Sequence, residues 1–250
     1  MPKRLPIKLG KEPLFEAACE LRVGGSVALN MMLPGLLFSQ GNTEVAALRQ
    51  LPSAMVPEQL RAMQPEFTYA PLVQMPFKGL LVQISARGLV VSSPTPYLGW
   101  AKFRPLIVEL FRVLLKSNLV PTVERFSLKY SNLLKTSVLP DPLGALDWTL
   151  RVGGLELNMP TTNLRSESLA EGLVTIITLS GGVFVQIEGQ APLEGALISV
   201  DTVCEKHQQA AADFLTTMEG ELDQVRRVNK AAFFECLTDD AISALEPQYE

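Results

Sequence analysis

The sequence predicts an α+β fold built from two pseudo-repeats, each consisting of antiparallel strands followed by a long helix. Three observations indicate this class: short segments alternate apolar and polar residues, two long segments place apolar residues at helical spacing, and both halves of the chain show the same order. Strands followed by helices form layered folds, so we expect curved sheets that carry the helices packed on one face.

The first strand is predicted over 14–23, where apolar residues such as Leu21 and Val23 alternate with charged ones. The following segment, 30–76, is rich in proline, which restricts it to short helices within a long connection. The best helical candidate in that connection is 57–63.

A hairpin and a long helix are predicted next. The apolar runs 79–85 and 89–93 are joined by a short loop that contains glycine, which is typical of a hairpin. Apolar residues at helical spacing predict an amphipathic helix over 100–118, in which Pro105 is tolerated only near the first turn. A long amphipathic strand is expected over 123–132.

The second half repeats this order after a breaker segment at 139–144. A serine-glycine-glycine turn is expected at 180–182, a long helix is expected to begin near Cys204 and to bend at Gly220, and a final helical turn is expected at 238–241. The strands predicted for this half are 148–152, 172–179, 183–188 and 196–203.

These elements suggest a division of the chain near its middle. Residues 1–138 are the first α+β half with an N-terminal arm, 139–144 are a linker, and 145–250 are the second half. We expect the two halves to form one compact unit. The alternative is two independent α+β domains that divide near residue 140.

Composition narrows the functional classes. The chain has 250 residues, of which 47% are apolar and 19% charged, so it can bury a core and does not resemble a disordered protein. Its net charge of −4 disfavours nucleic acid as the main ligand. No apolar run is long enough to span a membrane, and the N-terminus lacks a signal-peptide core, so a cytoplasmic location is expected.

The basic N-terminal arm is interpreted as a solvated segment, because its cations are spread among prolines rather than gathered into a patch. These cations are Lys3, Arg4, Lys8 and Lys11.

Cysteine and histidine usage indicates neither a disulfide framework nor a metal site. Cys19, Cys204 and Cys236 are widely spaced and odd in number, which suits a reducing compartment and small buried side chains. His207 is the only histidine, so the chain cannot build a site with several histidine ligands. We interpret His207 as a solvated residue early in the last helix, and we expect no cofactor.

Three segments resemble a sporadically distributed family of uncharacterised bacterial proteins. Residues 11–23 are similar to its opening motif, Lys-x-Pro-Ile-x-Glu-Ala-x-x-Glu-Ile-Arg-Phe, and 125–132 to its strand Arg-x-Gly-Leu-Arg-Tyr-x-Asn. Residues 232–247 are similar to its tail, which ends in a short helix and Glu-Pro. The resemblance implies a bacterial source and assigns no catalytic residue. The patchy distribution of the family suggests a role in bacterial defence.

Two groups of charged residues are candidate contacts. Glu16, Glu20 and Arg22 fall on the same face of the first predicted strand, where paired carboxylates can perform acid–base chemistry. The alternative, which we favour, is a structural ion-pair row with Arg22. In the later strand, Arg125 and Lys129 could contact an anionic ligand across the sheet.

Aromatic residues complete the candidate set. Tyr130 accompanies the cations of its strand, and a mixture of cations and aromatics can contact single-stranded nucleic acid, although the acidic net charge weakens that reading. Phe233 and Phe234 end the apolar stripe of the last helix. That stripe suits either core packing or a partner surface, and we favour the core.

The sequence therefore favours a non-enzymatic protein-interaction module or an accessory subunit of a bacterial complex. The expected partner is another protein or a second copy of the chain as a homodimer. The alternative is a small-ligand or enzymatic pocket between the sheet and the helix over 100–118. An interaction surface requires an exposed apolar patch, whereas a pocket requires a cavity in which charges converge without cancelling.

Overall fold

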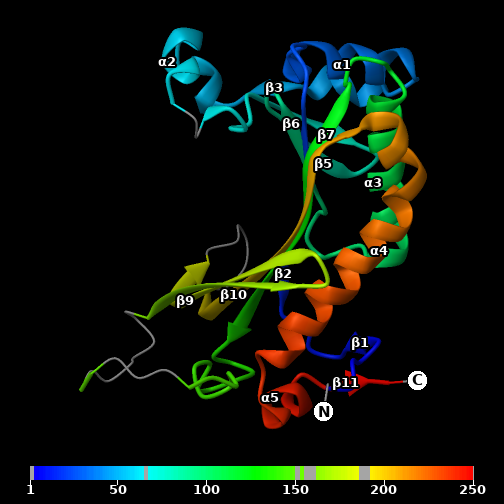
Figure 1. Cartoon of the computed structure of the whole chain (residues 1–250). Helices are drawn as coiled ribbons and strands as arrows, with labels where there is room; N and C mark the ends of the chain where they lie inside the picture. The colour runs from blue at the N-terminus through cyan, green and yellow to red at the C-terminus, as the bar shows by residue number, and fades with distance from the viewer. Residues whose placement is uncertain (1–2, 65–66, 150–152, 155–161, 186–191, 250) are drawn as a thin grey trace. The chain divides into compact units, whose positions relative to one another are not determined.

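The computed structural model describes residues 3–64, 67–149, 153–154, 162–185 and 192–249. These residues form a nine-stranded antiparallel sheet with the long helices α3 (Trp100–Leu115) and α4 (Ala211–Glu235) packed against it, which confirms the α+β prediction (Figure 1). In sheet order the strands are β3 (Arg49–Gln50), β4 (Val73–Phe77), β5 (Leu80–Ile84), β6 (Gly88–Ser92), β2 (Leu14–Val23), β7 (Thr122–Lys135), β10 (Leu193–Ala210), β9 (Leu173–Val185) and β8 (Asn163–Ala170).

Residue contacts divide the chain into two compact units. Unit 1 contains Met1–Phe15, Lys129–Thr202 and Val225–Glu250, and unit 2 contains Glu16–Leu128 and Val203–Gln224. Strands β2, β7 and β10 and helix α4 contribute residues to both units. The boundaries of the two predicted halves, 1–138 and 145–250, differ from those of the two units. The predicted repeat of strands followed by a long helix stays a prediction.

In unit 2, the predicted hairpin and first strand are confirmed. Strand β5 pairs with β6 in an antiparallel register that sets Val82 opposite Val91, and β6 pairs with β2 so that Leu89 faces Leu21. All four side chains are at most 1% exposed. The alternation of apolar and charged residues in β2 therefore marks the face of the strand that enters the core.

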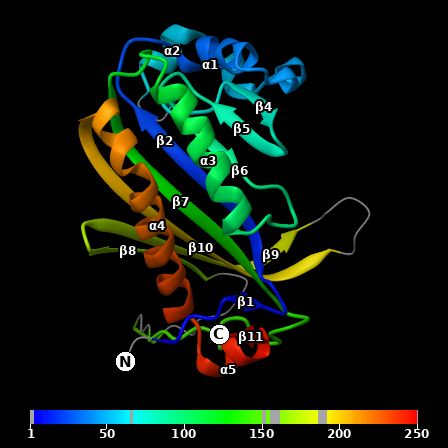
Figure 2. The same cartoon turned by 90° about the vertical axis from the view of Figure 1, so that its right-hand side faces the viewer.

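Helix α3 covers the strands of unit 2, as Figure 2 shows for β2 and β6. It buries one apolar stripe, and Phe103, Ile107 and Phe111 are fully enclosed. Pro105 lies in the second turn, beyond the first turn to which the prediction confined it. Because Pro105 and Ala101 are both exposed, water can satisfy the carbonyl group of Ala101 that the missing N–H leaves unbonded.

The connection after β2 contains more regular structure than its prolines suggest. Helix α1 (Leu29–Ser39) has 11 residues and continues through Pro34, because leucines at four-residue spacing form a buried stripe. Strand β4 contains Pro76, which is tolerated because β3 pairs only with Val73 and Gln74 and leaves this part of β4 at the sheet edge. The remaining short helices are η1 (Thr43–Ala47), η2 (Pro52–Met55) and α2 (Glu58–Ala62), the last as predicted.

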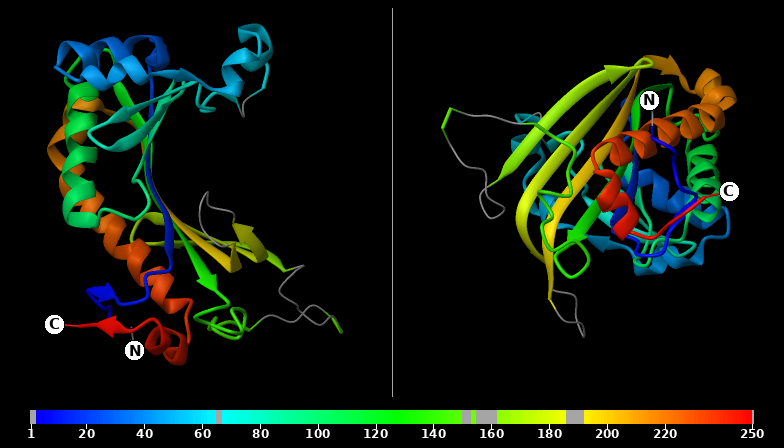
Figure 3. Two further views of the ribbon diagram at one scale, coloured as in Figure 1. Left: turned by 180° about the vertical axis from the view of Figure 1, so that it is seen from behind. Right: turned by 90° about the horizontal axis from the view of Figure 1, so that it is seen from below.

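In unit 1, β8 and β9 form a hairpin that the sequence did not predict in full. Its two-residue turn, Glu171 and Gly172, has positive φ at both positions (54° and 74°), as a tight hairpin turn requires. The turn expected at 180–182 is wrong: β9 continues to Val185, and Gly182 takes a φ of 61° within the strand. Figure 3 shows β8, β9 and β10 as a curved ribbon.

Two other strands predicted for the second half fall partly outside the described residues. In the predicted strand 148–152, Trp148 and Thr149 lie in a loop, and 150–152 are not described. In the predicted strand 183–188, residues 183–185 belong to β9, and 186–188 are not described.

The start of the last helix is corrected by the structure. Helix α4 begins at Ala211 rather than near Cys204, and His207 lies on β10, exposed, with a φ of 46°. The strand is held in unit 2 by Lys206, whose Nζ lies 2.6 Å from Glu221 and 5.6 Å from the ring centroid of Phe214. We attribute the extended conformation of 204–210 to this contact, although the residues of this segment favour a helix.

The N-terminal arm belongs to unit 1 and is anchored at several points, while three of its four cations, Arg4, Lys8 and Lys11, are exposed as the prediction of a solvated arm expects. Lys3 Nζ lies 3.2 Å from Asp147, and its backbone N–H donates to Glu235. Arg4 lies 4.6 Å from the ring centroid of Tyr249. Lys3, Arg4 and Lys11 thus contact Asp147, Tyr249 and Glu246, and these contacts anchor the arm. Strand β1 (Lys8–Leu9) pairs with β11 (Pro247–Gln248), which follows α5 (Asp239–Ala244) along the chain.

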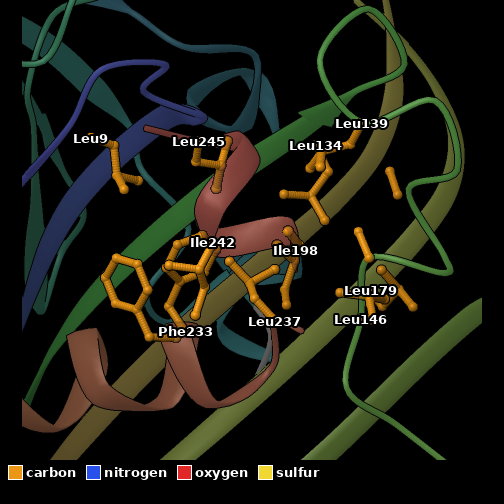
Figure 4. Close-up of a cluster of buried hydrophobic side chains, with 14 of the residues drawn as sticks. Leu9, Leu134, Leu139, Leu146, Leu179, Ile198, Phe233, Leu237, Ile242 and Leu245 are labelled. Carbon is orange, nitrogen blue, oxygen red and sulfur yellow. The ribbon is translucent and has the colours of Figure 1, made fainter. Parts of the chain in front are cut away.

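The core of unit 1 gathers the arm, the last turns of α4, and α5. Phe233 lies next to Ile242 in Figure 4, and Leu9 and Leu245 close the cluster from the paired ends of the chain. The predicted final helical turn is confirmed, because Thr238 Oγ1 accepts a hydrogen bond of 3.2 Å from the N–H of Ala241 as an N-cap.

Two glycine substitutions should change stability in opposite directions. A Cβ at Gly195 would lie 2.2 Å from the carbonyl oxygen of Leu134, so Gly195→Ala should destabilise the protein by roughly 1–3 kcal/mol. At Gly220, within α4, a Cβ meets open space, so Gly220→Ala should stabilise it by about 0.5–1 kcal/mol. Urea unfolding of both variants checks the signs, and equal effects would contradict the close strand approach.

Candidate functional site

Three of the predicted contact residues meet in unit 2. Glu20 Oε1 lies 3.0 Å from Arg22 Nε, and its second oxygen lies 3.1 Å from Arg125. All three side chains are about one-fifth to one-quarter exposed. Alternation along β2 places Glu16 on the same face as Glu20 and Arg22, and Glu16 is half-buried.

These contacts extend into what we call the ion-pair row. The guanidinium of Arg22 lies 4.2 Å from the ring centroid of Tyr69, whose hydroxyl donates to Glu124. Glu124 also accepts from Arg87. Burial, followed by the hydrogen bond to Glu124, raises the pKa of the Tyr69 phenol. The members of the row are Glu20, Arg22, Tyr69, Arg87, Glu124, Arg125 and Glu205, the last lying 3.9 Å from Arg125.

The charges in this row cancel, since three carboxylates face three guanidinium groups. An anion site needs cations left over after pairing. The ion-pair row leaves none, because each of its guanidinium groups lies beside a carboxylate. The structural interpretation of Glu20 and Arg22 therefore fits the geometry.

The remaining candidates lie in unit 1. Lys129 and Tyr130 are neighbours on β7, so their side chains point to opposite faces. Phe233 and Phe234 are 6% and 4% exposed and pack edge to face with ring centroids 5.2 Å apart. Both residues are buried, which agrees with the hypothesis that the apolar stripe of the last helix packs in the core. They are therefore not exposed partner contacts.

Tyr130, Phe233 and Phe234 nevertheless share one feature, because all three line a pocket of about 70 Å³ in unit 1. We call it the arm pocket, since the N-terminal arm forms one wall. Its charged and amide-bearing residues are Lys8, Glu12, Asn132, Arg226, Asn229 and Lys230. The sequence analysis did not select most of these residues. The spacing of Arg226, Asn229, Lys230 and Phe233 could have indicated them, because residues three or four apart lie on the same face of a helix.

Electrostatics in the arm pocket differ from those in the ion-pair row. Glu12 is exposed when its whole surface is considered, yet desolvation of its carboxyl group raises the pKa of that group. Nearby Arg226 and Lys230 only partly offset this rise. Desolvation, followed by repulsion from Arg226, lowers the pKa of Lys230. Arg226 itself stacks on Tyr130 at 4.6 Å. Like charges therefore remain close together here.

A different region of unit 2 exposes apolar side chains. Over 29–63, six large apolar residues are 46–78% exposed, and we call them the methionine-rich surface. They are Met31, Met32, Phe38, Met55, Leu60 and Met63. Met31 also lines a groove of about 340 Å³ that it shares with Phe67 and Leu72 and with charged groups of Glu58 and Arg61.

Among the described residues, no group of three histidine, cysteine, aspartate or glutamate side chains lies close enough to hold a metal ion. The three cysteines carry no disulfide bond. None of the described helices combines the length and the apolar character needed to cross a bilayer. No protein-family model and no curated protein matches the sequence.

The structural role of the ion-pair row predicts a stability effect. Glu20→Ala should lower the free energy of unfolding by roughly 1–3 kcal/mol, because Arg22 and Arg125 both lose a partly buried partner. The matched control is Glu171→Ala, which removes the exposed pair with Arg227 and should leave the free energy of unfolding nearly unchanged. Denaturant unfolding compares the two, and equal losses would contradict this role.

Cys236 should react slowly as a nucleophile. Burial raises the pKa of its thiol to about 11, so little thiolate is present at neutral pH. In a Cys19→Ala, Cys204→Ala background, reaction with a disulfide reagent at mildly alkaline pH should be roughly 100-fold slower in the folded than in the unfolded protein. Absorbance of the released thiolate gives both rates, and similar rates would show that the thiol is accessible and ionised.

Proposed function

We propose that this chain is a non-enzymatic protein-interaction module that binds an apolar segment of another protein through the methionine-rich surface. The observation that carries the proposal is the concentration of exposed apolar side chains over 29–63. Of the eleven large hydrophobic residues found exposed among the described residues, six belong to this one segment. Single exposed hydrophobics are ordinary, whereas several of them within one segment, with Met31 and the α2 residues Glu58 and Arg61 lining one groove, suit an interaction surface.

The local structure explains why these side chains are exposed. Helix α1 already buries Leu29, Leu33 and Leu37 on one face, so Met31 and Phe38, seven residues apart, lie together on another face. Their exposed fractions are 74% and 62%. Helix α1 therefore has one apolar face that is buried in the core and a second apolar face that is exposed to solvent.

The chemistry of the surface fits a protein partner. Methionine is unbranched and polarisable, and its flexible side chain adapts to partners of different shape. The groove beside Met31 adds an apolar floor with Glu58 and Arg61 among its lining residues. A helix or an extended segment with one or two apolar anchors matches this combination.

The ion-pair row supports the non-enzymatic part of the proposal, because its charges neutralise one another instead of converging on a cavity. A cytoplasmic location and an accessory role in a bacterial complex, including a defence complex, belong to the same proposal. They are supported by the cysteine usage and by the family resemblance of the two ends and the middle of the chain.

Site-specific photocrosslinking in the native host tests this function. A photoreactive phenylalanine analogue replaces Met63 or Met31, and the matched control carries it at Leu169, which lies in unit 1 and is 76% exposed against 78% for Met63. We expect one discrete crosslinked protein from the Met31 and Met63 positions and none from Leu169. Mass spectrometry identifies the product.

A second set of variants checks that the crosslinks report affinity. Met31→Glu with Phe38→Glu should reduce recovery of that protein at least tenfold, because charges enter the apolar contact. Phe184→Glu, at a 70% exposed position in unit 1, should leave recovery unchanged. Crosslinks to this same chain would replace the partner by a homodimer, and equal crosslinking from all three positions would overturn the proposal.

A further inference from the structure

The arm pocket holds more positive than negative charge. Three cations, Lys8, Arg226 and Lys230, line it with a single carboxylate, Glu12. In a chain whose net charge is −4, such a local excess of cations runs against the overall balance. Desolvation, followed by repulsion from Arg226, lowers the pKa of Lys230, and a bound anion would favour the charged form of both cations.

The cations are held by the fold rather than by long mobile side chains alone. Asn229 is 1% exposed, and its Nδ2 donates to Val200 O at 2.8 Å and to Thr202 Oγ1 at 3.2 Å. These bonds fix α4 against β10 within unit 1, with Arg226 one turn before Asn229 and Lys230 immediately after it. Arg226 is held over the ring of Tyr130, with its guanidinium carbon 4.6 Å from the ring centroid.

The arm closes the same pocket through backbone bonds. Strand β1 pairs Lys8 with Gln248, the N–H of Ile7 donates to Gln248 O at 2.7 Å, and the N–H of Gly10 donates to Glu246 O at 2.9 Å. Lys8 is therefore carried by a segment anchored on both sides. This arrangement presents cations from two separate parts of the chain to one small space.

The size of the space limits the ligand. A volume of about 70 Å³ exceeds the roughly 10–15 Å³ that one water needs, yet it is far below the roughly 300–1,000 Å³ of pockets for larger organic ligands. A small tetrahedral anion or the anionic end of a small molecule is of the right size. Two cations in excess match a doubly charged group.

Glu12 indicates which doubly charged group fits. Its carboxylate lines the pocket and can accept a hydrogen bond from a neighbouring O–H group. A phosphoryl group still carries a proton near neutral pH and can donate that bond, whereas sulfate carries none. We infer that the arm pocket is a binding site for a phosphoryl group, carried by inorganic phosphate or by a small phosphate monoester.

Calorimetric titration with sodium phosphate at constant ionic strength tests this inference on the full-length protein. Arg226→Gln and Lys230→Gln should each raise the dissociation constant at least tenfold, because each removes a charged hydrogen-bond donor. The matched control is Arg227→Gln on the same helix, whose side chain is 58% exposed and pairs with Glu171 outside the pocket lining. It should bind phosphate as the wild type does.

Two further titrations separate the possible ligands. Sulfate should bind the wild-type protein about tenfold more weakly than phosphate, and Glu12→Gln should remove most of that difference, because the carboxylate acceptor is lost. Glycerol 3-phosphate in place of phosphate distinguishes the two sources: tighter binding assigns the site to a monoester, and weaker binding assigns it to inorganic phosphate.

The contrary results are equally definite. If phosphate produces no binding heat and leaves its phosphorus resonance unbroadened at millimolar protein, or if Arg227→Gln weakens binding as much as Lys230→Gln, the inference is wrong. Lys8→Gln, a change on the exposed arm, serves if a helix variant fails to fold. The site does not depend on the methionine-rich surface, so either proposal can fail alone.

Discussion

The hydrogen-bonded ladder of the antiparallel sheet is the constraint on which the rest of the structure depends. In a ladder, successive side chains must point to opposite faces, and in β2 the buried Cys19, Leu21 and Val23 alternate with Glu20 and Arg22. Charges on the other face are too enclosed to remain unpaired. The ion-pair row follows from that requirement, because Glu20 lies between two guanidinium groups.

Local pattern was enough to predict the elements whose two faces differ. The hairpin β5–β6, the strands β2 and β7 and the helix α3 all carry an apolar stripe at a fixed period, and the structure contains each of them. Strand β8 was missed because its residues are almost all exposed and its apolar residues, Leu164, Leu169 and Ala170, do not alternate with polar ones. It is held in place by pairing with β9, a non-local contact that single-sequence patterns do not contain.

Proline and helix propensity misled the prediction where tertiary contacts decide. Pro34 and Pro76 suggested irregular chain, but a leucine stripe sustains α1 and an edge position accommodates β4. Residues 204–210 have a helix-forming composition, yet Lys206 is held by Glu221 beside an aromatic ring, and the chain stays extended until Ala211. The candidate sites show the same limit, because Glu12 and Lys230 are far apart in sequence and only the fold brings them to one pocket.

The two proposed sites differ in the source of the binding free energy. At the methionine-rich surface, the gain is removal of apolar area from water, which is non-directional and suits a protein segment. In the arm pocket, the gain is relief of cation repulsion, which suits a small anion. The ion-pair row differs from both sites, because its charges are already paired with one another and offer little binding free energy to a ligand.

Methyl NMR of the protein labelled at its methionines tests the central claim most directly, because the chain carries its own controls. Met31, Met55 and Met63 are 74–78% exposed, whereas Met75 and Met218 are fully buried. In cleared extract of the native host, compared with serum albumin at equal concentration, we expect the exposed methyl signals to shift or broaden and the buried ones to stay unchanged. Unchanged signals from all five methyl groups would contradict a partner bound at this surface.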